Sequence, residues 1–134
     1  MHVVIMGCGR VGSTLATRLD REGHAVTIID TDPYAFRRLG SEFGGEKLVG
    51  SGFDEHTLEA ADIRQAESFL ALTQGDNRNL LAAQMAKHLF GVRVVVARVY
   101  DPFRGEIFAN LGVRTFSPTN VGADMAYEAL TREQ

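Results

Sequence analysis

The chain has 134 residues, of which 45% are apolar and 23% charged, and its formal net charge is −3. This length and composition predict one globular domain over residues 1–134, and the acidic balance argues against a nucleic-acid-binding surface. No apolar run is long enough to insert into a bilayer, and Cys8 as the only cysteine excludes an intrachain disulfide. Both features fit a cytoplasmic protein.

The first thirty residues predict a strand, a glycine turn, a helix and a second strand. An almost wholly apolar strand, His2–Met6, leads into the sequence GCGRVG, and a helix over about Ser13–Arg21 follows. The second strand, Ala25–Ile29, ends immediately before Asp30. This order, with an acid after the second strand, is the fingerprint of a dinucleotide-binding βαβ unit.

Each residue of this fingerprint has a mechanical role. Gly7 allows a tight turn after the strand, Gly9 lets a pyrophosphate approach the backbone, and Gly12 lets the helix pack closely on the sheet. The free N–H groups at the start of the helix attract the phosphates. Asp30 accepts hydrogen bonds from the ribose hydroxyls and, with Asp32, repels a 2′-phosphate, which predicts NAD(H) or a plain adenine nucleotide rather than NADP. The alternative is that these residues only form a turn and begin a loop.

Two features beside this unit are open to two interpretations. Cys8 is expected to be a small side chain facing the sheet rather than a redox nucleophile, because no histidine or second cysteine lies near it in sequence. A second helix, N-capped by Asp32, carries Tyr34, Arg37 and Arg38. These three are either surface residues or include one that lies over the adenine.

A third strand, Glu46–Val49, is followed by a glycine-containing loop and a short helix, Asp54–Ala60. In a doubly wound sheet the adenine lies between the loops after the second and third strands. Gly52, Phe53 and Asp54 are therefore candidate adenine contacts. The alternative is a plain loop in which Asp54 caps the helix.

A fourth strand, Glu67–Thr73, and a long helix over about residues 78–90 flank a second polar loop. The fourth strand neighbours the first where the strand order reverses, so its loop faces the glycine turn. We therefore expect Thr73, Asp76 and Asn77 to contact the second half of a dinucleotide or terminal phosphates. The alternative for Asp76 is that it only caps the helix.

The remaining chain completes an alternating pattern of strands and helices. A fifth strand, Arg93–Ala97, leads to Arg98, which either faces the ligand or pairs with an acid such as Asp101. The last expected elements are a helix at Pro102–Leu111, a strand at Val113–Phe116 and a helix at Asn120–Leu130. The pattern predicts an α/β, doubly wound Rossmann-type fold with a mostly parallel six-stranded sheet in the order 3-2-1-4-5-6.

Two helices, at residues 80–90 and 102–111, are apolar on more than one face. This pattern predicts burial against a second chain, and hence a homodimer. The alternative is ordinary packing on the sheet, which uses one face of a helix only.

The sequence shows no machinery for turnover. His2, His24, His56 and His88 do not cluster, no spacing of cysteines and histidines indicates a metal site, and no Walker A lysine is present. We therefore expect no catalytic residue, no metal and no enzymatic activity. The alternative is the cofactor-binding half of an NAD-dependent oxidoreductase whose catalytic part is on another chain.

The ordered motifs VVIMGCGRVG, IIDTDP, TQGDNRNLLAAQMAK, ARVYDP and LGVRTFSP resemble the RCK (KTN) domain family, in particular the N-terminal domains of TrkA-type proteins. The resemblance covers essentially the whole chain. It implies a domain that binds NAD(H), ATP, ADP or AMP and assembles as dimers or rings beneath a membrane potassium pore. The partner would be a transporter subunit of the TrkH, TrkG or KtrB type, which would hold this cytoplasmic protein at the inner face of the membrane. Ligand exchange would then gate potassium uptake; a nucleotide sensor for another partner is the alternative.

The resemblance also assigns residue roles. The glycines of the turn and Arg10 would hold phosphates, with Arg10 able to reach terminal phosphates, and Asp30 would hold the ribose. The full set of expected nucleotide-binding residues is Gly7, Cys8, Gly9, Arg10, Val11, Gly12, Asp30, Thr31, Asp32, Gly52, Phe53, Thr73, Asp76, Asn77 and Arg98.

Two departures from the family pattern affect these expectations. Many relatives continue into a small C-terminal subdomain that this chain lacks, so the chain is either a single-domain form or part of a longer protein. Some relatives carry an acid, associated with a divalent ion between subunits, just after the residue that matches Pro118. Thr119 and Asn120 stand here instead, so no such metal is expected.

Overall fold

The computed structural model describes residues 1–132 as one sheet flanked by helices. The strands are β1 (His2–Met6), β2 (Ala25–Asp30), β3 (Glu46–Val49), β4 (Ser68–Ala71), β5 (Val94–Arg98) and β6 (Arg114–Phe116). The α-helices are α1 (Arg10–Arg21), α2 (Glu55–Ala60), α3 (Asp76–Gln84), α4 (Pro102–Ala109) and α5 (Pro118–Thr131). Shorter helical segments are η1 (Pro33–Leu39), η2 (Ile63–Gln65) and η3 (Met85–Leu89).

The sheet has the order β3-β2-β1-β4-β5-β6, and all neighbouring strands are parallel. The predicted doubly wound fold and its strand order are therefore confirmed. β1 is central, with Val4 opposite Thr27 of β2 and Phe69 of β4. Because the order reverses between β1 and β4, the loops after these strands lead to opposite sides of the sheet from one shared edge.

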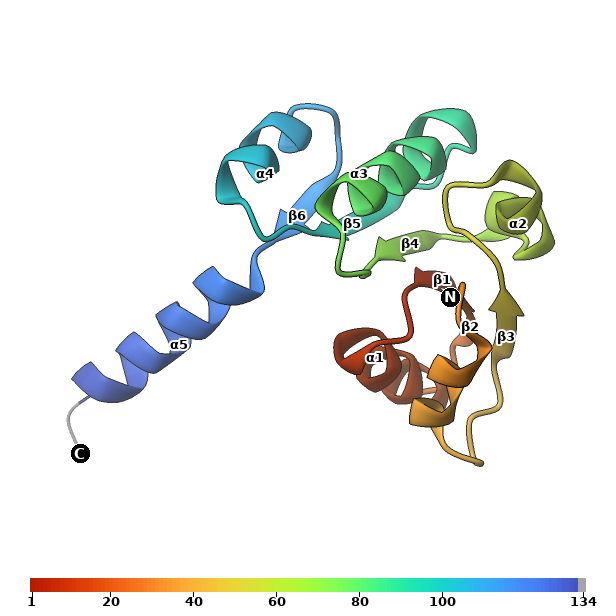
Figure 1. Cartoon of the computed structure of the whole chain (residues 1–134), viewed down its shortest axis with the longest axis horizontal. Helices are drawn as coiled ribbons and strands as arrows, with labels where there is room; N and C mark the ends of the chain where they lie inside the picture. The colour runs from red at the N-terminus through yellow and green to blue at the C-terminus, as the bar shows by residue number, and fades with distance from the viewer. Residues whose placement is uncertain (133–134) are drawn as a thin grey trace.

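Helices cover both faces of the sheet (Figure 1). One core cluster joins the sheet to α2, η2 and α3 and includes Phe69, Leu58 and Ile63, while the other joins it to α1 and η1. Alternate residues of β1 enter the two clusters, and Val4 and Ile5 are both fully buried. Burial on both faces explains why β1 is apolar without a break.

Several helices differ in extent from the sequence-based expectation. α1 begins at Arg10 rather than Ser13, because the N–H of Ser13 already bonds to the carbonyl of Gly9 at 2.9 Å. The segment after β2 is a 3-10 helix, and α3 begins at Asp76 and continues as a π-helix, η3, before Phe90. None of these shifts changes the end of the sheet at which each loop lies.

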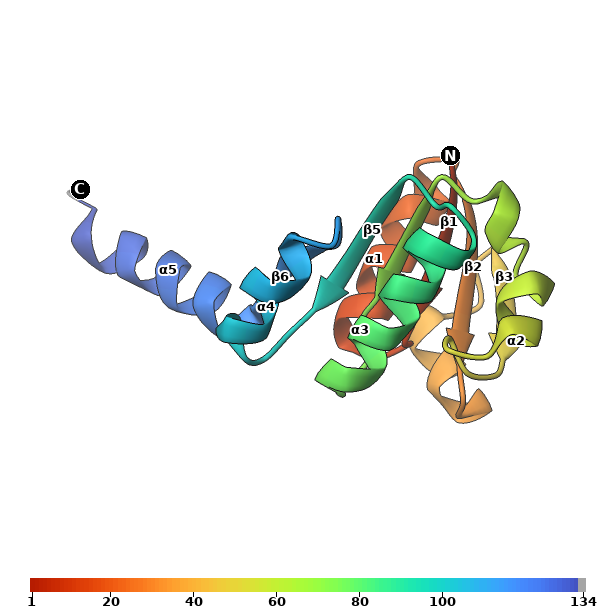
Figure 2. The ribbon, with the colours of Figure 1, turned by 90° about the horizontal axis from the view of Figure 1, so that it is seen from above.

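The last helix, α5, projects from the sheet instead of folding back over it (Figures 1 and 2). None of its residues is buried. The face of the sheet that carries α1 is consequently incomplete, and Leu70, Val96 and Phe116 are only half-buried there. None of the helices within residues 1–132 combines the length and the apolar character needed to cross a membrane.

Candidate functional site

The glycine turn has the geometry that its sequence predicts. Gly7 has a φ of +106°, and its N–H donates to the carbonyl of Ile29 at 2.8 Å. A Cβ atom on Gly12 would lie 1.9 Å from the carbonyl oxygen of Gly7, a distance that no side chain tolerates. The turn and the close packing of α1 on β1 therefore both require glycine.

Gly9 occupies a different environment within the same turn. It is the N-cap of α1, it offers no side-chain cap, and a Cβ atom added to it would meet nothing within 4 Å. Open space thus lies over the backbone where the first turn of α1 directs its N–H groups. A helix start without a capping side chain, open to solvent, is suited to an anion such as a phosphate.

Asp30 lies at the end of β2 and is tied to the glycine turn. Its Oδ2 accepts a hydrogen bond from the N–H of Cys8 at 2.8 Å, and its Oδ1 accepts one from the N–H of Asp32 at 2.9 Å. Each carboxylate oxygen has a second lone pair for a further donor such as a ribose hydroxyl. Asp32 is the N-cap of η1 and accepts from the N–H of Tyr34 at 3.0 Å, and Thr31 is exposed between the two acids.

Cys8 is fully buried in the core cluster beneath α1, which confirms its expected packing role. Its Sγ lies 3.4 Å from the carbonyl oxygen of Ala35. Burial, with the nearby Asp30 carboxylate adding to it, raises the pKa of the Cys8 thiol to about 11. At neutral pH the side chain is therefore a neutral thiol.

Tyr34, Arg37 and Arg38 of η1, expected either at the surface or over the adenine, occupy different positions. The guanidinium of Arg37 lies over the ring of Tyr34, 3.9 Å from its centre. Arg38 instead donates to the backbone carbonyl of Cys8 at 3.4 Å, at the rim of the glycine turn. Of these three side chains, Arg38 is the one that the structure brings to the candidate site.

The loop after β3 packs directly on the end of β1. A Cβ atom on Gly52 would lie 1.9 Å from the Sδ of Met6, whereas Phe53 is 41% exposed at the same edge. Asp54 caps α2, since its carboxylate accepts from the N–H of Thr57 at 3.3 Å and from its hydroxyl at 2.9 Å. The hydroxyl hydrogen bond lowers the pKa of Asp54. The predicted cap is confirmed, and an adenine contact by Gly52 or Phe53 stays a prediction.

A buried amide joins the loop after β4 to the end of β5. The Oδ1 of Asn79 accepts from the N–H and the hydroxyl of Thr73, at 2.9 and 2.6 Å, and its Nδ2 donates to the carbonyls of Thr73 and Arg98, both at 2.9 Å. Asn79 is fully buried, and sequence reasoning did not single it out. The available signal was a polar residue on the otherwise buried face of an apolar helix.

Arg98 carries a buried charge that no acid neutralises. Its side chain donates twice to the carbonyl of Thr73, at 3.2 and 2.7 Å, and the whole residue is 9% exposed. Among residues 1–132 no carboxylate pairs with it; Asp101, the expected partner, instead lies 3.8 Å from Arg104. Its guanidinium also lies 5.2 Å from the centre of the Tyr100 ring. A nearly buried cation without an opposite charge, at the carboxyl edge of the sheet, is suited to an anionic ligand.

Asp76 and Asn77 follow Gly75, the N-cap of α3, and bridge two loops. The carboxylate of Asp76 accepts from the N–H of Tyr100 at 2.8 Å and from the N–H of Asp101 at 3.1 Å. The amide oxygen of Asn77 accepts from the guanidinium of Arg104. Capping of α3 is therefore not the role of the Asp76 side chain, and ligand contact by these residues stays a prediction.

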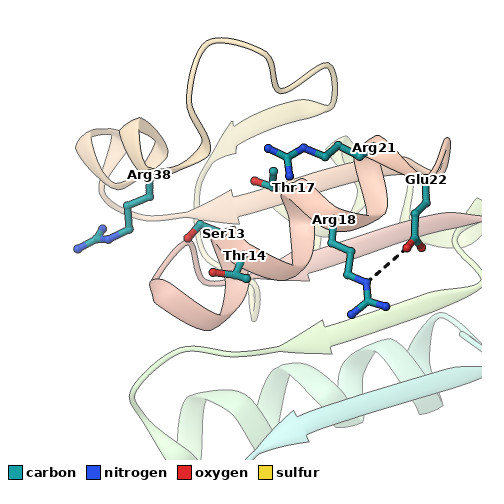
Figure 3. A pocket seen from close by; sticks show the side chains of 7 residues that line it. All are labelled: Ser13, Thr14, Thr17, Arg18, Arg21, Glu22 and Arg38. Atoms are coloured by element: carbon teal, nitrogen blue, oxygen red, sulfur yellow. Dashed lines mark hydrogen bonds and ion pairs between the residues drawn. The ribbon is translucent and has the colours of Figure 1, made fainter.

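A hollow of about 480 Å³ lies beside the exposed flank of α1 (Figure 3). Its lining includes none of the residues predicted to hold a nucleotide; it comprises Ser13, Thr14, Thr17, Arg18, Arg21, Glu22 and Arg38. Arg18 pairs with Glu22 at 3.4 Å along the same side of α1. The candidate site is instead the open surface along the carboxyl ends of the strands, formed by the glycine turn, Asp30, the loops after β3 and β4, and Arg98. We call this surface the shelf.

No group of three or more histidine, cysteine, aspartate or glutamate side chains within residues 1–132 is suited to a metal ion.

Comparison with known families identifies this arrangement. The model of the TrkA-N domain family matches residues 3–118. The chain belongs to the TrkA-N domain family. This TrkA-N domain is 51% identical over 130 residues to the Trk system potassium uptake protein TrkA of Streptomyces coelicolor. The match covers 97% of the chain but only 58% of that relative.

Solved structures share the fold at low sequence identity. The TrkA-N domain of the inner membrane protein ybaL from Escherichia coli superposes with a TM-score of 0.86 at 19% identity, with 96% of each chain covered. The Kef C-terminal domain of Shewanella denitrificans in an AMP-bound form superposes with a TM-score of 0.78 at 24% identity, covering 98% of this chain and 80% of that one. These matches confirm the Rossmann-type architecture.

Proposed function

We propose that this TrkA-N domain is a nucleotide-sensing regulatory domain of a potassium uptake system. The arrangement of Asp30 and the glycine turn carries the proposal. The Asp30 carboxylate, which is placed to bind a ribose, is hydrogen-bonded to the turn that leads into the open start of α1, which is placed to bind phosphates. The name of the Streptomyces relative supports potassium uptake, and the AMP-bound Kef domain supports an adenine nucleotide as ligand. The chain spans only 58% of the length of that relative, so a role in potassium uptake is itself part of what we propose for this chain.

The proposed ligand is NAD(H) or ATP, ADP or AMP. Gly9 and the N–H groups of Arg10, Val11 and Gly12 would bind the pyrophosphate, and Asp30 would bind the ribose. Arg98 would neutralise phosphates on the other side of the shelf, since its buried charge has no acidic partner among residues 1–132. Gly52 and Phe53 would border the adenine.

The proposed assembly is a homodimer, formed by the helices that follow β5 and β6. Phe103 and Ile107 on α4 are 80% and 63% exposed, and Met125 and Leu130 on α5 are 67% and 83% exposed. An isolated helix of this length is marginal in water, so a helix with no buried residue requires a partner surface. A second copy would cover these side chains and the incomplete half of the sheet. Within residues 80–90, Leu80, Ala83 and Ala86 pack in the chain's own core. Leu81 and Leu89 are each 51% exposed and would be the contribution of this segment to the interface.

The dimer would act on a membrane potassium transporter subunit of the TrkH, TrkG or KtrB type and lie at the inner face of the membrane. Two nucleotides regulate such a partner only if they favour different arrangements of the subunits, because equal affinity for both arrangements shifts no equilibrium. The domain itself would bind and exchange nucleotides without catalysis. Hydride transfer by the isolated chain would instead support the alternative of an oxidoreductase half.

Calorimetric titration with ATP, ADP, AMP, NAD and NADH tests the proposed ligand. Among residues 1–132 the side chain of Arg10 has no hydrogen-bond or ion-pair partner, so it is available to terminal phosphates. Arg10→Ala should lower the affinity for ATP by about tenfold or more, and the affinity for AMP much less. Arg18→Ala is the matched control, because Arg18 pairs with Glu22 farther along the same helix. Absence of any binding to the unmodified chain contradicts the proposal.

A further inference from the structure

The carboxylate of Asp76 connects the predicted phosphate end of the shelf to the start of α4. Asp76 follows β4 in the loop opposite the glycine turn, and it is half-buried. Both of its oxygens accept hydrogen bonds from consecutive backbone N–H groups, those of Tyr100 and Asp101, at 2.8 and 3.1 Å. A charged acceptor makes these bonds stronger than bonds between neutral groups.

The residues that Asp76 holds determine where α4 begins. The side chain of Asp101 is the N-cap of α4 and accepts from the N–H of Phe103 at 3.1 Å. Arg104, one turn into α4, donates to Asn77 beside Asp76. α4 is also held against β6, where a Cβ atom on Gly105 would lie 2.8 Å from the hydroxyl oxygen of Thr115. Phe108 of α4 also packs against the core cluster that contains α3. The hydrogen bonds to residues 76 and 77 link the start of α4 to the loop after β4.

Two opposite charges lie on these same two loops. Arg98 ends β5 and holds the carbonyl of Thr73, which precedes Asp76 in the loop after β4. A polyphosphate bound beside this loop attracts Arg98 and repels Asp76. Both effects strain the connection between the loop after β4 and the segment that begins α4.

We infer that Asp76 is a positioning residue that couples the charge of the bound nucleotide to the position of α4. This inference rests on the proposed function, since it needs a nucleotide on the shelf. ATP, with its additional phosphates, loosens the hydrogen bonds from Tyr100 and Asp101 to Asp76, whereas AMP leaves them intact. α4 carries Phe103 and Ile107, so its release changes the surface proposed for the dimer.

Amide hydrogen exchange, measured by NMR on the whole chain, tests this coupling at the two donor groups. The wild-type chain and Asp76→Asn are compared without ligand, with ATP and with AMP, each nucleotide saturating the variant under study. Asparagine keeps one acceptor oxygen but loses the charge and the second acceptor. Without ligand, the substitution should speed exchange at Asp101 by about tenfold or more. In the wild type, ATP should speed exchange at Tyr100 and Asp101 by at least about threefold relative to AMP.

In Asp76→Asn the ratio of the exchange rates with ATP and AMP should fall to about one. Asp20→Asn is the matched control, since it removes a carboxylate that accepts from the N–H of Gly44 away from the shelf and should keep the wild-type ratio. An undiminished ratio in Asp76→Asn overturns the inference while leaving the proposed function intact. Equal exchange with ATP and AMP in the wild type overturns it as well. Failure of the wild type to bind either nucleotide instead contradicts the proposed function, and with it the coupling.

Discussion

The carboxylate of Asp30 and the backbone N–H of Cys8 are joined by a hydrogen bond with an N–O distance of 2.8 Å. Cys8 stands between the first two glycines of the turn, so the acid at the end of β2 fixes the loop at the end of β1. The predicted sugar-binding and phosphate-binding elements are therefore one connected unit. A change at Asp30 should affect both the stability of the turn and the affinity for the ligand.

Replacing Asp30 by alanine should weaken AMP binding by about tenfold or more, because the ribose hydroxyls and two backbone N–H groups lose a charged acceptor. We also expect the free energy of unfolding to fall by roughly 1–3 kcal/mol. Calorimetry and urea unfolding measure the two effects. Asp20→Ala is a suitable control, because Asp20 accepts from the N–H of Gly44 at 2.9 Å at the opposite edge of the sheet. If both variants bind AMP like the wild type, Asp30 does not hold the ribose.

Gly9 and Gly12 should respond differently to the same added methyl group. Gly12→Ala should lower the free energy of unfolding by about 3 kcal/mol or prevent folding, since its Cβ atom would lie 1.9 Å from the carbonyl oxygen of Gly7. Gly9→Ala should leave stability within about 1 kcal/mol, because its Cβ atom would enter open space. That space is the predicted approach of the phosphates, so AMP affinity should fall at least about tenfold. Thermal unfolding measures the effect on stability and calorimetry the effect on binding. Unchanged AMP affinity in Gly9→Ala would show that the phosphates do not bind at this position.

Phe103→Asp should convert the proposed dimer to a monomer. A charge at the centre of an apolar interface is costly to bury, whereas the side chain is 80% exposed in the single chain and should tolerate the change. Sedimentation velocity at micromolar concentration measures the association state. Tyr34→Asp, which alters a 65% exposed aromatic residue on η1, should leave it unchanged. A wild-type chain that remains monomeric at these concentrations would indicate that α4 and α5 pack against something other than a second copy.

The Cys8 thiol should react slowly in the folded protein. Its pKa is raised from 9.0 to about 11, chiefly by burial, so the thiolate fraction at pH 8 is about a hundredfold lower than in the unfolded chain. Iodoacetamide labelling with and without urea should show at least this difference in rate. The neutral thiol is the form that the fold favours, so the contribution of Cys8 to stability is complete below pH 9 and is lost as the pH rises through 11. Equal labelling rates in both conditions would mean that the turn opens freely.

The local pattern of the chain was enough to predict the strands and the glycine turn. Gly7 and Gly12 mark a turn and a close contact that depend on neighbouring backbone, and Asp32 and Asp54 proved to be helix caps. The ion pair suggested between Arg98 and Asp101 was wrong, because Asp101 lies beside Arg104 and caps α4. Sequence spacing alone does not determine which of two nearby cations an acid meets, because both lie within reach along the chain.

Hydrophobic periodicity and glycine placement are local properties, so the sequence by itself was enough to predict the strands and the glycine turn. The alternation of strands and helices then predicted the doubly wound strand order that the sheet has. The tertiary structure decided how the polar groups are shared. It placed Asn79 between two strand ends, gave the Asp76 carboxylate to residues 100 and 101, and left α5 without a partner surface. Each of these outcomes depends on contacts between residues distant in sequence, where several donors compete for one acceptor and only the packed chain selects among them.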